Sequence, residues 1–154
     1  MAILETHHLS RRYGSLVALD DLNLKVEAGE CFGFIGPNGA GKTTTIKILA
    51  TLLKPSSGEA RVCGFTVGWQ NTHIRPLIGY VPDFLGAYDD MLVREYLQFF
   101  ASCYGITGSR RTQVVDDALS LTDLGGKAEA PISGLSRGMS QRLAVARVLL
   151  HDPE

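Results

Sequence analysis

Long apolar runs are missing from this sequence, since no stretch approaches the roughly 18 residues that a membrane-spanning helix needs. The first residues, MAILETHHLS, contain neither a basic region followed by an apolar core nor a cleavage site, so no secretion signal is indicated. Low-complexity stretches are missing too, and 45% of the 154 residues are hydrophobic against 20% charged. The sequence therefore predicts a soluble, globular, cytosolic chain that buries one core.

An excess of either charge is also missing. Fifteen Lys and Arg residues stand against sixteen Asp and Glu residues, which gives a formal net charge of −1. Because non-specific binding to nucleic acid depends on positive charge, the chain as a whole gives no electrostatic reason to expect it. The balance leaves room only for a local basic patch.

Cysteine is scarce, and Cys31, Cys63 and Cys103 are odd in number and widely spaced. This pattern indicates neither a disulfide framework nor a zinc site. Their apolar or strand-like neighbours predict small buried side chains in a reducing compartment. The four histidines also lack the spacing of metal ligands, so we interpret them as surface or structural residues.

Residues 36–44 read GPNGAGKTT and fit the phosphate-binding loop pattern G-x-x-x-x-G-K-[ST]. Glycines let the backbone curl closely enough for a ring of N–H groups to meet phosphate oxygens, and the following helix adds N–H groups without intrahelical partners. Lys42 is expected to reach the β and γ phosphates, Thr43 to place its hydroxyl on Mg²⁺, and Thr44 to face the α phosphate. The predicted nucleotide-binding residues of this loop are Gly36, Pro37, Asn38, Gly39, Ala40, Gly41, Lys42, Thr43 and Thr44.

The flanks of this loop fit a nucleotide site. Residues 31–35, CFGFI, form a short apolar run typical of a buried parallel strand, and residues 42–53 carry apolar side chains at helical spacing. A strand, a loop and a helix in this order favour phosphate binding over the alternative, an ordinary glycine-rich turn.

Antiparallel strands are predicted on both sides of that unit, because residues 22–27 alternate strictly between apolar and polar and residues 59–67 again read as a strand. Residues 78–81, IGYV, predict a second buried strand that Pro82 stops. Asp83 lies at the carboxyl end of this strand, where ligands collect in open α/β sheets. It is therefore a site candidate, with a solvated turn aspartate as the alternative.

Two amphipathic helices follow, over residues 93–104 and around residues 114–119, with no strand between them. This arrangement indicates a helical subdomain inserted into an α/β core. A turn rich in glycine and serine at residues 131–142 then leads into a helix that runs through Leu150. The N-terminus of that helix is a second candidate anion site, with a simple helix cap as the alternative.

Together these motifs resemble the ATP-binding cassette (ABC) ATPases, the motor domains of ABC transporters, from about Leu4 to the last residue. Tyr13 matches the aromatic residue that stacks on adenine, with a strand tyrosine packed on the sheet as the alternative. Residues 36–44 match the P-loop, IGYVPD takes the place of the Q-loop, and LSRGMSQR resembles the signature motif LSGGQ.

The resemblance implies an α/β fold of the P-loop NTPase class, with an antiparallel β subdomain and an inserted helical subdomain. Residues 1–154 would form one ABC ATPase domain. Residues 1–86 and 131–154 would make its core and antiparallel region, and residues from about 87 to 130 its helical subdomain.

The resemblance also implies ATP and Mg²⁺ as cofactors, and a head-to-tail dimer in which Ser136 and Gly138 act on the nucleotide of a second ABC ATPase subunit. The implied catalytic residues are Lys42, Asp83, Ser136 and Gly138, and the implied metal ligands are Thr43 and Asp83. We therefore expect the ATPase subunit of a transporter, which couples ATP hydrolysis to solute transport. It would lie peripherally at the cytoplasmic face of the membrane, bound to a transmembrane permease subunit, with no nucleic acid as a partner.

Three departures from the family pattern qualify this expectation. Asp83 stands where the family commonly has Gln, and its shorter, charged side chain changes the geometry toward Mg²⁺ and the attacking water. Arg137 and Met139 replace Gly and Gln in the signature motif, a variation associated with exporter-like members whose membrane part is a separate polypeptide. The sequence stops at Glu154, before the family's Walker B strand and catalytic glutamate; the apolar run LVALDD at 16–21 is assigned to structure because it precedes the P-loop.

We therefore expect a fold that is incomplete at its C-terminal end, from an N-terminal piece of a longer reading frame. Such a piece should bind MgATP weakly or not at all and should not hydrolyse it alone. Two other function classes stay open: a soluble ABC ATPase acting on ribosomes or DNA, and a non-catalytic nucleotide-binding regulator. The sequence contains neither two cassettes nor long coiled-coil arms, which mark the soluble class.

Overall fold

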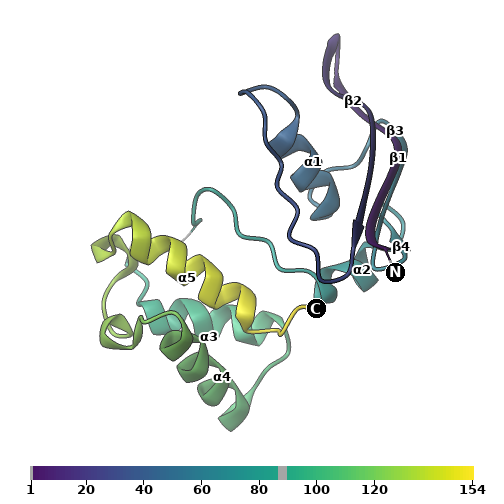
Figure 1. The fold of residues 1–154 in the computed structure, drawn as a ribbon. Coiled ribbons are helices and arrows are strands. Elements are labelled where there is room, and N and C mark those ends of the chain that lie inside the picture. Colours follow the sequence, from purple (N-terminus) through teal and green to yellow (C-terminus); the bar gives the residue numbers. More distant parts are fainter. Residues whose placement is uncertain (1, 87–89) are drawn as a thin grey trace. The chain divides into compact units, whose positions relative to one another are not determined.

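The computed structural model describes residues 2–86 and 90–154, which divide into two compact units (Figure 1). We call Met1–Ile78 the sheet unit and Gly79–Glu154 the helical unit. Each unit has a hydrophobic core of its own. The mixed α/β composition and the antiparallel sheet agree with the predicted fold class. The predicted start of the helical subdomain, at about residue 87, lies outside the described residues.

An antiparallel sheet in the order β2-β1-β3-β4 forms the frame of the sheet unit. β1 (Ala2–Tyr13) and β2 (Leu16–Glu27) make a long hairpin, and their alternating pattern confirms the predicted strand at residues 22–27. β2 also takes up residues 16–21, which confirms that this run is structural.

The strand predicted at residues 59–67 is a hairpin and not a single strand. β3 (Ser57–Val62) pairs with β1 on one side and with the short β4 (Phe65–Thr66) on the other. Between them Cys63 and Gly64 have φ values of 50° and 80°, the two successive positive angles of a type I′ turn. The turn matches the twist of the two strands, so the chain reverses there.

Helix α1 (Lys42–Leu49) packs on this sheet with Thr45 and Ile48 buried, and α2 (Asn71–Ile74) and the 3-10 helix η1 (Arg75–Leu77) complete the unit. α1 ends before the predicted limit at residue 53. Thr51 has a φ of 62°, and the N–H groups of Leu52 and Leu53 both donate to the Lys47 carbonyl, at 2.9 and 3.1 Å. A left-handed residue followed by such back-bonding is how helices commonly end.

Neither of the two buried parallel strands predicted at residues 31–35 and 78–81 is a strand in the structure. Phe32 is 51% exposed and Ile35 is 97% exposed. A strand satisfies its N–H and C=O groups only through a neighbouring strand, and no strand of the described residues pairs with either segment. Apolar composition alone therefore does not place them in a sheet.

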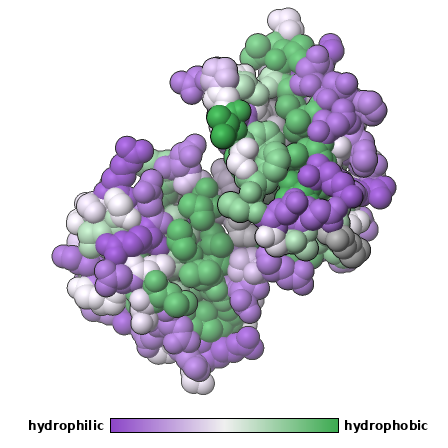
Figure 2. All heavy atoms as spheres, in the orientation of Figure 1, coloured by the Kyte–Doolittle hydropathy of each residue, from purple (hydrophilic) through white to green (hydrophobic). Residues whose placement is uncertain are grey.

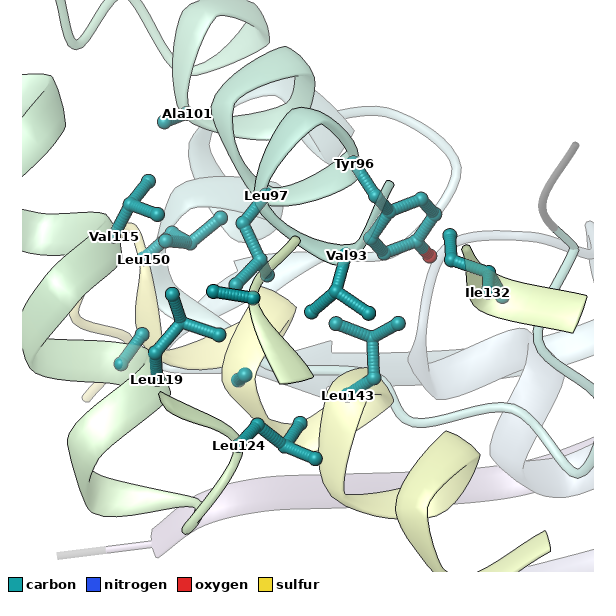
Figure 3. Close-up of a cluster of buried hydrophobic side chains, with 13 residues drawn as sticks. Val93, Tyr96, Leu97, Ala101, Val115, Leu119, Leu124, Ile132, Leu143 and Leu150 are labelled. Atoms are coloured by element: carbon teal, nitrogen blue, oxygen red, sulfur yellow. The ribbon is translucent and has the colours of Figure 1, made fainter. Parts of the chain in front are cut away.

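Three helices build the helical unit: α3 (Val93–Cys103), α4 (Gly108–Leu121) and α5 (Arg137–Leu149), with the 3-10 helices η2 (Gly125–Lys127) and η3 (Ile132–Gly134) between α4 and α5. All three long helices were predicted from the sequence, and they are confirmed. Figure 3 shows side chains from α3, α4 and α5 pointing toward one another. The labelled members of this core are Val93, Tyr96, Leu97, Ala101, Val115, Leu119, Leu124, Ile132, Leu143 and Leu150.

The segment at 78–81 is bound to Arg147 of α5 and not to a neighbouring strand of the described residues. Its guanidinium donates to the Tyr80 carbonyl and to the Tyr96 hydroxyl, both at 3.2 Å, and lies 5.1 Å from the centroid of the Phe100 ring. Burial raises the pKa of Tyr96, and the nearby Arg147 charge opposes that rise. A Cβ added to Gly79 would overlap Val148, so the segment also lies directly against α5.

Arg94 joins three parts of the helical unit. Its guanidinium forms ion pairs with Asp116 of α4 at 2.5 Å and with Glu129 at 2.7 Å. Its backbone N–H group donates to the Ala128 carbonyl. These two carboxylates raise the pKa of Arg94. The side chain therefore fixes the segment after α4 against the start of α3.

The surface of both units carries apolar side chains, which Figure 2 shows in green. Cys31 and Cys103 are exposed, so the prediction that they are buried is wrong. Cys63 is partly buried. Cys31 is exposed because its segment pairs with no strand of the described residues, and Cys103 because it lies on the outer side of α3. Among the described residues, no helix is both long and apolar enough to cross a bilayer.

Candidate functional site

The predicted phosphate-binding loop, residues 36–44, lies in the sheet unit between the exposed segment at 31–35 and helix α1. Lys42, the first residue of α1, turns its ammonium back over the loop and donates to the carbonyl oxygens of Gly36 and Pro37, both at 2.6 Å. The Ala40 N–H group closes a turn onto the Pro37 carbonyl at 3.3 Å. The loop thus curls around the lysine ammonium, and its outer surface is exposed.

Two glycines give the loop this shape. Gly39 and Gly41 have φ values of 84° and 83°, which glycine adopts without strain. At Gly41 space is also limiting, because an added Cβ would lie 2.7 Å from the Ala18 carbonyl oxygen and 3.3 Å from Leu19 Cδ1. Glycine at this position lets the loop rest directly on β2.

The start of α1 offers the donors that an anion needs. The first helical hydrogen bond runs from the Thr45 N–H group to the Gly41 carbonyl at 2.8 Å, and the Thr45 hydroxyl donates to the same carbonyl at 3.0 Å. The N–H groups before Thr45 precede the first intrahelical bond, and the first turn contains no acidic residue. Partial positive charge at the helix N-terminus therefore adds to the charge of Lys42.

Tyr13 lies in the same unit, at the end of β1, where the chain turns through Gly14 into β2. Its side chain is 46% exposed. One face of the ring is covered by the Arg11 guanidinium, whose carbon lies 4.6 Å from the ring centroid. The tyrosine can offer a ring face to a flat ligand, as stacking on a base requires.

The helical unit holds the other predicted site residues, Asp83, Ser136 and Gly138. Asp83 lines a pocket of about 540 Å³ together with the first turns of α5, through Arg137, Ser140 and Gln141. The sequence-based prediction did not anticipate that Asp83 shares a pocket with the signature-like motif. No local pattern contains this information, because the two segments are more than fifty residues apart in the chain.

Ser136 is the N-cap of α5, where its hydroxyl accepts from the Met139 N–H group at 3.3 Å and its carbonyl accepts from the Ser140 hydroxyl at 3.2 Å. Gly138 differs from Gly41, because a Cβ added to it would meet no atom within 4 Å. The fold of this unit therefore does not itself require glycine at position 138.

The structure groups the predicted residues by unit. Tyr13 and residues 36–44 belong to the sheet unit, and Asp83, Ser136 and Gly138 belong to the helical unit. Among the described residues no group of three or more His, Cys, Asp or Glu side chains could hold a metal ion. Thr43, the predicted metal ligand of the loop, is exposed in the first turn of α1.

Arg11 is the clearest contact residue that sequence reasoning missed. The available signal was its position two residues before Tyr13 on one strand, which puts both side chains on the same face of the sheet.

Comparison with known proteins gives consistent matches along the chain. A family model described as ABC transporter matches residues 19–154. The Nod factor export ATP-binding protein I of Burkholderia pseudomallei (strain K96243) is 39% identical over 154 residues, which is all of this chain and 51% of that protein. The protein of the same name from Ralstonia nicotianae is 39% identical over 152 residues and is covered to 47%.

The solved structures that this chain resembles are also described as parts of ABC transporters. The ATP binding subunit of an ABC transporter is 28% identical with a TM-score of 0.84, over 98% of this chain and 63% of that one. The protein cbiO1 from Clostridium perfringens, part of the ABC transporter complex cbiONQ, is 27% identical with the same TM-score, over 99% and 62%. The chain spans about half the length of the curated relatives it matches.

Proposed function

The chain belongs to the ABC transporter family, and from that membership we propose that it is the nucleotide-binding part of a transporter's ATPase subunit. The observation that carries the proposal is the lysine-centred phosphate loop at the start of α1. Its second support is the likeness to ATP-binding proteins over the whole chain.

The nucleotide's phosphates would replace the loop carbonyls as partners of the Lys42 ammonium. The N–H groups of the loop and of the first turn of α1 would bind the remaining phosphate oxygens. Because these donors are already oriented by the Gly39 and Gly41 turns and by the packing of Gly41 on β2, little reorganisation is needed when the phosphates arrive. Tyr13 would stack on the base.

Mg²⁺, when bound, would supply positive charge that offsets the charge of the phosphates. The exposed hydroxyl of Thr43 suits one of its ligand positions, and oxygen donors of this kind are what Mg²⁺ prefers. The Asp83 carboxylate would hold Mg²⁺ or one of its waters. In our assignment Asp83 is, after Thr43, the second protein residue that provides an oxygen ligand.

Ser136 and Gly138 would act on the nucleotide of a second subunit in a head-to-tail dimer. Two observations on this chain support that role: Ser136 is exposed at a helix N-terminus, and Gly138 is a glycine for which the unit's own packing gives no reason. A phosphate approaching α5 needs the close backbone contact that a side chain would block.

In the complete domain, residues 1–86 and 131–154 would make the core, and residues from about 87 to 130 the helical subdomain. The subunit would lie at the cytoplasmic face of the membrane with a permease subunit, which would move the solute. The named relatives support this assembly, since one is named Nod factor export ATP-binding protein I and another is described as part of the ABC transporter complex cbiONQ.

The test is the ATPase activity of the full-length protein and of its Lys42→Ala variant. Loss of the phosphate-binding ammonium should lower the turnover rate about a hundredfold or more. Lys47→Ala is the matched control, because Lys47 is an exposed lysine in the last turn of the same helix and should leave turnover unchanged. Equal activity of the wild type and the Lys42→Ala variant would exclude the proposal.

The class of function is tested by what purifies with the protein from detergent-solubilised membranes. A multi-span membrane protein in a fixed ratio supports the transporter subunit. Ribosomes or DNA in its place would favour the soluble ABC class.

A further inference from the structure

We propose that Arg11 positions the Tyr13 ring for base stacking, so that nucleotide affinity depends on a cation–π pair behind the base. The inference rests on the proposed function and adds a residue to it. Arg11 and Tyr13 are neighbours on one face of β1, and the guanidinium carbon lies 4.6 Å from the ring centroid. This distance is well within the range of a cation–π interaction.

The guanidinium is fixed from its other side as well. Its Nη1 atom donates to the carbonyl of Lys54 at 2.8 Å. The segment that contains Lys54 is itself bonded to β1, because the Ser56 N–H group donates to the Ser10 carbonyl at 2.9 Å and the Ser56 hydroxyl accepts from the Arg12 N–H group at 3.0 Å. Arg11 is therefore a rigid support for the ring.

A rigid support on one face leaves the opposite ring face for the ligand. Tyr13 stands at a hairpin end and is half exposed, where a tyrosine without such a contact would change rotamers freely. Holding it in one rotamer lowers the entropy lost when a base stacks on it. This is the benefit that we assign to Arg11.

A purely structural role accounts poorly for an arginine here. Among the described residues Arg11 has no ion pair with a carboxylate, and its Nε atom is buried without a hydrogen bond. Burying such a group is unfavourable unless something offsets it. The ring of Tyr13 and the Lys54 carbonyl are the two contacts that do so.

Arg11 also connects β1 to the chain beyond helix α1. Lys54 follows α1, the helix that begins at the predicted phosphate loop, and its carbonyl accepts the Arg11 hydrogen bond. Tyr13 and the loop belong to the same unit.

The experiment measures, by calorimetry on the full-length protein, the affinity for ATP and for inorganic tripolyphosphate, which has no base. Arg11→Gln should weaken ATP binding about three- to tenfold and leave tripolyphosphate binding unchanged. Arg12→Gln is the matched control, because it removes the same charge one residue away, and it should leave the affinity for ATP near the wild-type value. Tyr13→Ala should weaken ATP binding, and adding Arg11→Gln to it should then have no further effect.

Each other result overturns the inference in a distinct way. Equal weakening of ATP and tripolyphosphate by Arg11→Gln would assign Arg11 to general electrostatics or to folding. If Arg12→Gln weakens ATP binding as much as Arg11→Gln does, Arg11 likewise acts through general electrostatics or folding. If Arg11→Gln leaves ATP binding unchanged, Arg11 does not position the Tyr13 ring. A wild-type protein that binds neither ligand would instead overturn the proposed function itself.

Two further measurements guard against a folding defect. Trp69, the only tryptophan of the chain, lies with its ring centroid 5.7 Å from Lys54 Nζ, so its fluorescence reports on the segment that Arg11 contacts. Should Arg11→Gln alter that signal, Arg11→Lys takes its place, because it keeps the charge and loses the planar fork. It should give an intermediate affinity for ATP with unchanged tripolyphosphate binding, and a loss shared by both ligands would contradict the inference.

Discussion

At the scale of single residues, the two motif glycines Gly41 and Gly138 have different surroundings. The fold requires glycine at position 41, because φ is positive there and an added Cβ would overlap the Ala18 carbonyl oxygen. A Cβ added to Gly138 would meet no atom within 4 Å, so the packing of the helical unit does not require glycine at that position. The sequence pattern treats both as motif glycines and does not distinguish them.

Gly41→Ala should destabilise the sheet unit by roughly 2–4 kcal/mol, since it combines a strained backbone angle with an overlap against β2. Urea unfolding followed by Trp69 fluorescence measures this change, because Trp69 belongs to the same unit. Unfolding at the wild-type midpoint would show that the loop can leave β2 at little cost.

Gly138→Ala should keep the stability of the protein and lower its ATPase activity. Its stability should equal the wild type's or exceed it by up to about 1 kcal/mol, because alanine is the better helix former in the first turn of α5. The ATPase rate of the full-length protein should fall, because the added methyl group would meet the partner's nucleotide. A variant as active as the wild type would remove Gly138 from the shared site.

At the scale of the elements, the ion pairs of Arg94 join α3 to α4 and to the segment before η3. Arg94→Ala should destabilise the helical unit by about 1 kcal/mol, a modest value because both carboxylates are largely exposed. Circular dichroism during thermal unfolding measures the loss. Raising the salt concentration should reduce the difference from the wild type, and a salt-independent difference would point to lost packing.

The elements show where sequence reasoning succeeds. The three long helices were predictable because each carries its own signal: an apolar stripe at helical spacing, and for α5 the serine N-cap at Ser136. The part of β2 at residues 22–27 was predictable from its strict alternation. The curled shape of the loop at residues 36–44 was predictable because its glycine and lysine spacing sets the local geometry.

The predictions failed where the structure depends on distant partners. Residues 31–35 and 78–81 are apolar enough for buried strands, but a strand exists only through its neighbours, and the second segment is bonded to Arg147 of α5 instead. The contact of Arg11 with Tyr13 and Lys54, and the pocket that Asp83 shares with α5, likewise depend on tertiary packing. Local sequence places Arg11 and Tyr13 on one face of a strand, but no window along the chain contains the contact with Lys54 or the pocket at Asp83.

At the scale of the whole molecule, the separate cores of the two units imply separate stabilities. Leu143 is fully buried in the helical core, and Leu143→Ala should destabilise that unit by about 2–5 kcal/mol. Tripolyphosphate binding, which we assign to the sheet unit, should persist in this variant. Loss of binding together with helical structure would show that the two units unfold as one.

The uncovered segment at residues 31–35 has a practical consequence for the protein in solution. CFGFI is a run of five residues without charge or proline, and Phe32 and Ile35 face the solvent. Short uncharged apolar segments of this kind are typical nuclei of aggregation. Solubility and the need for chaperones should therefore depend on these few side chains, and Ile35→Lys should raise the concentration at which the protein stays soluble.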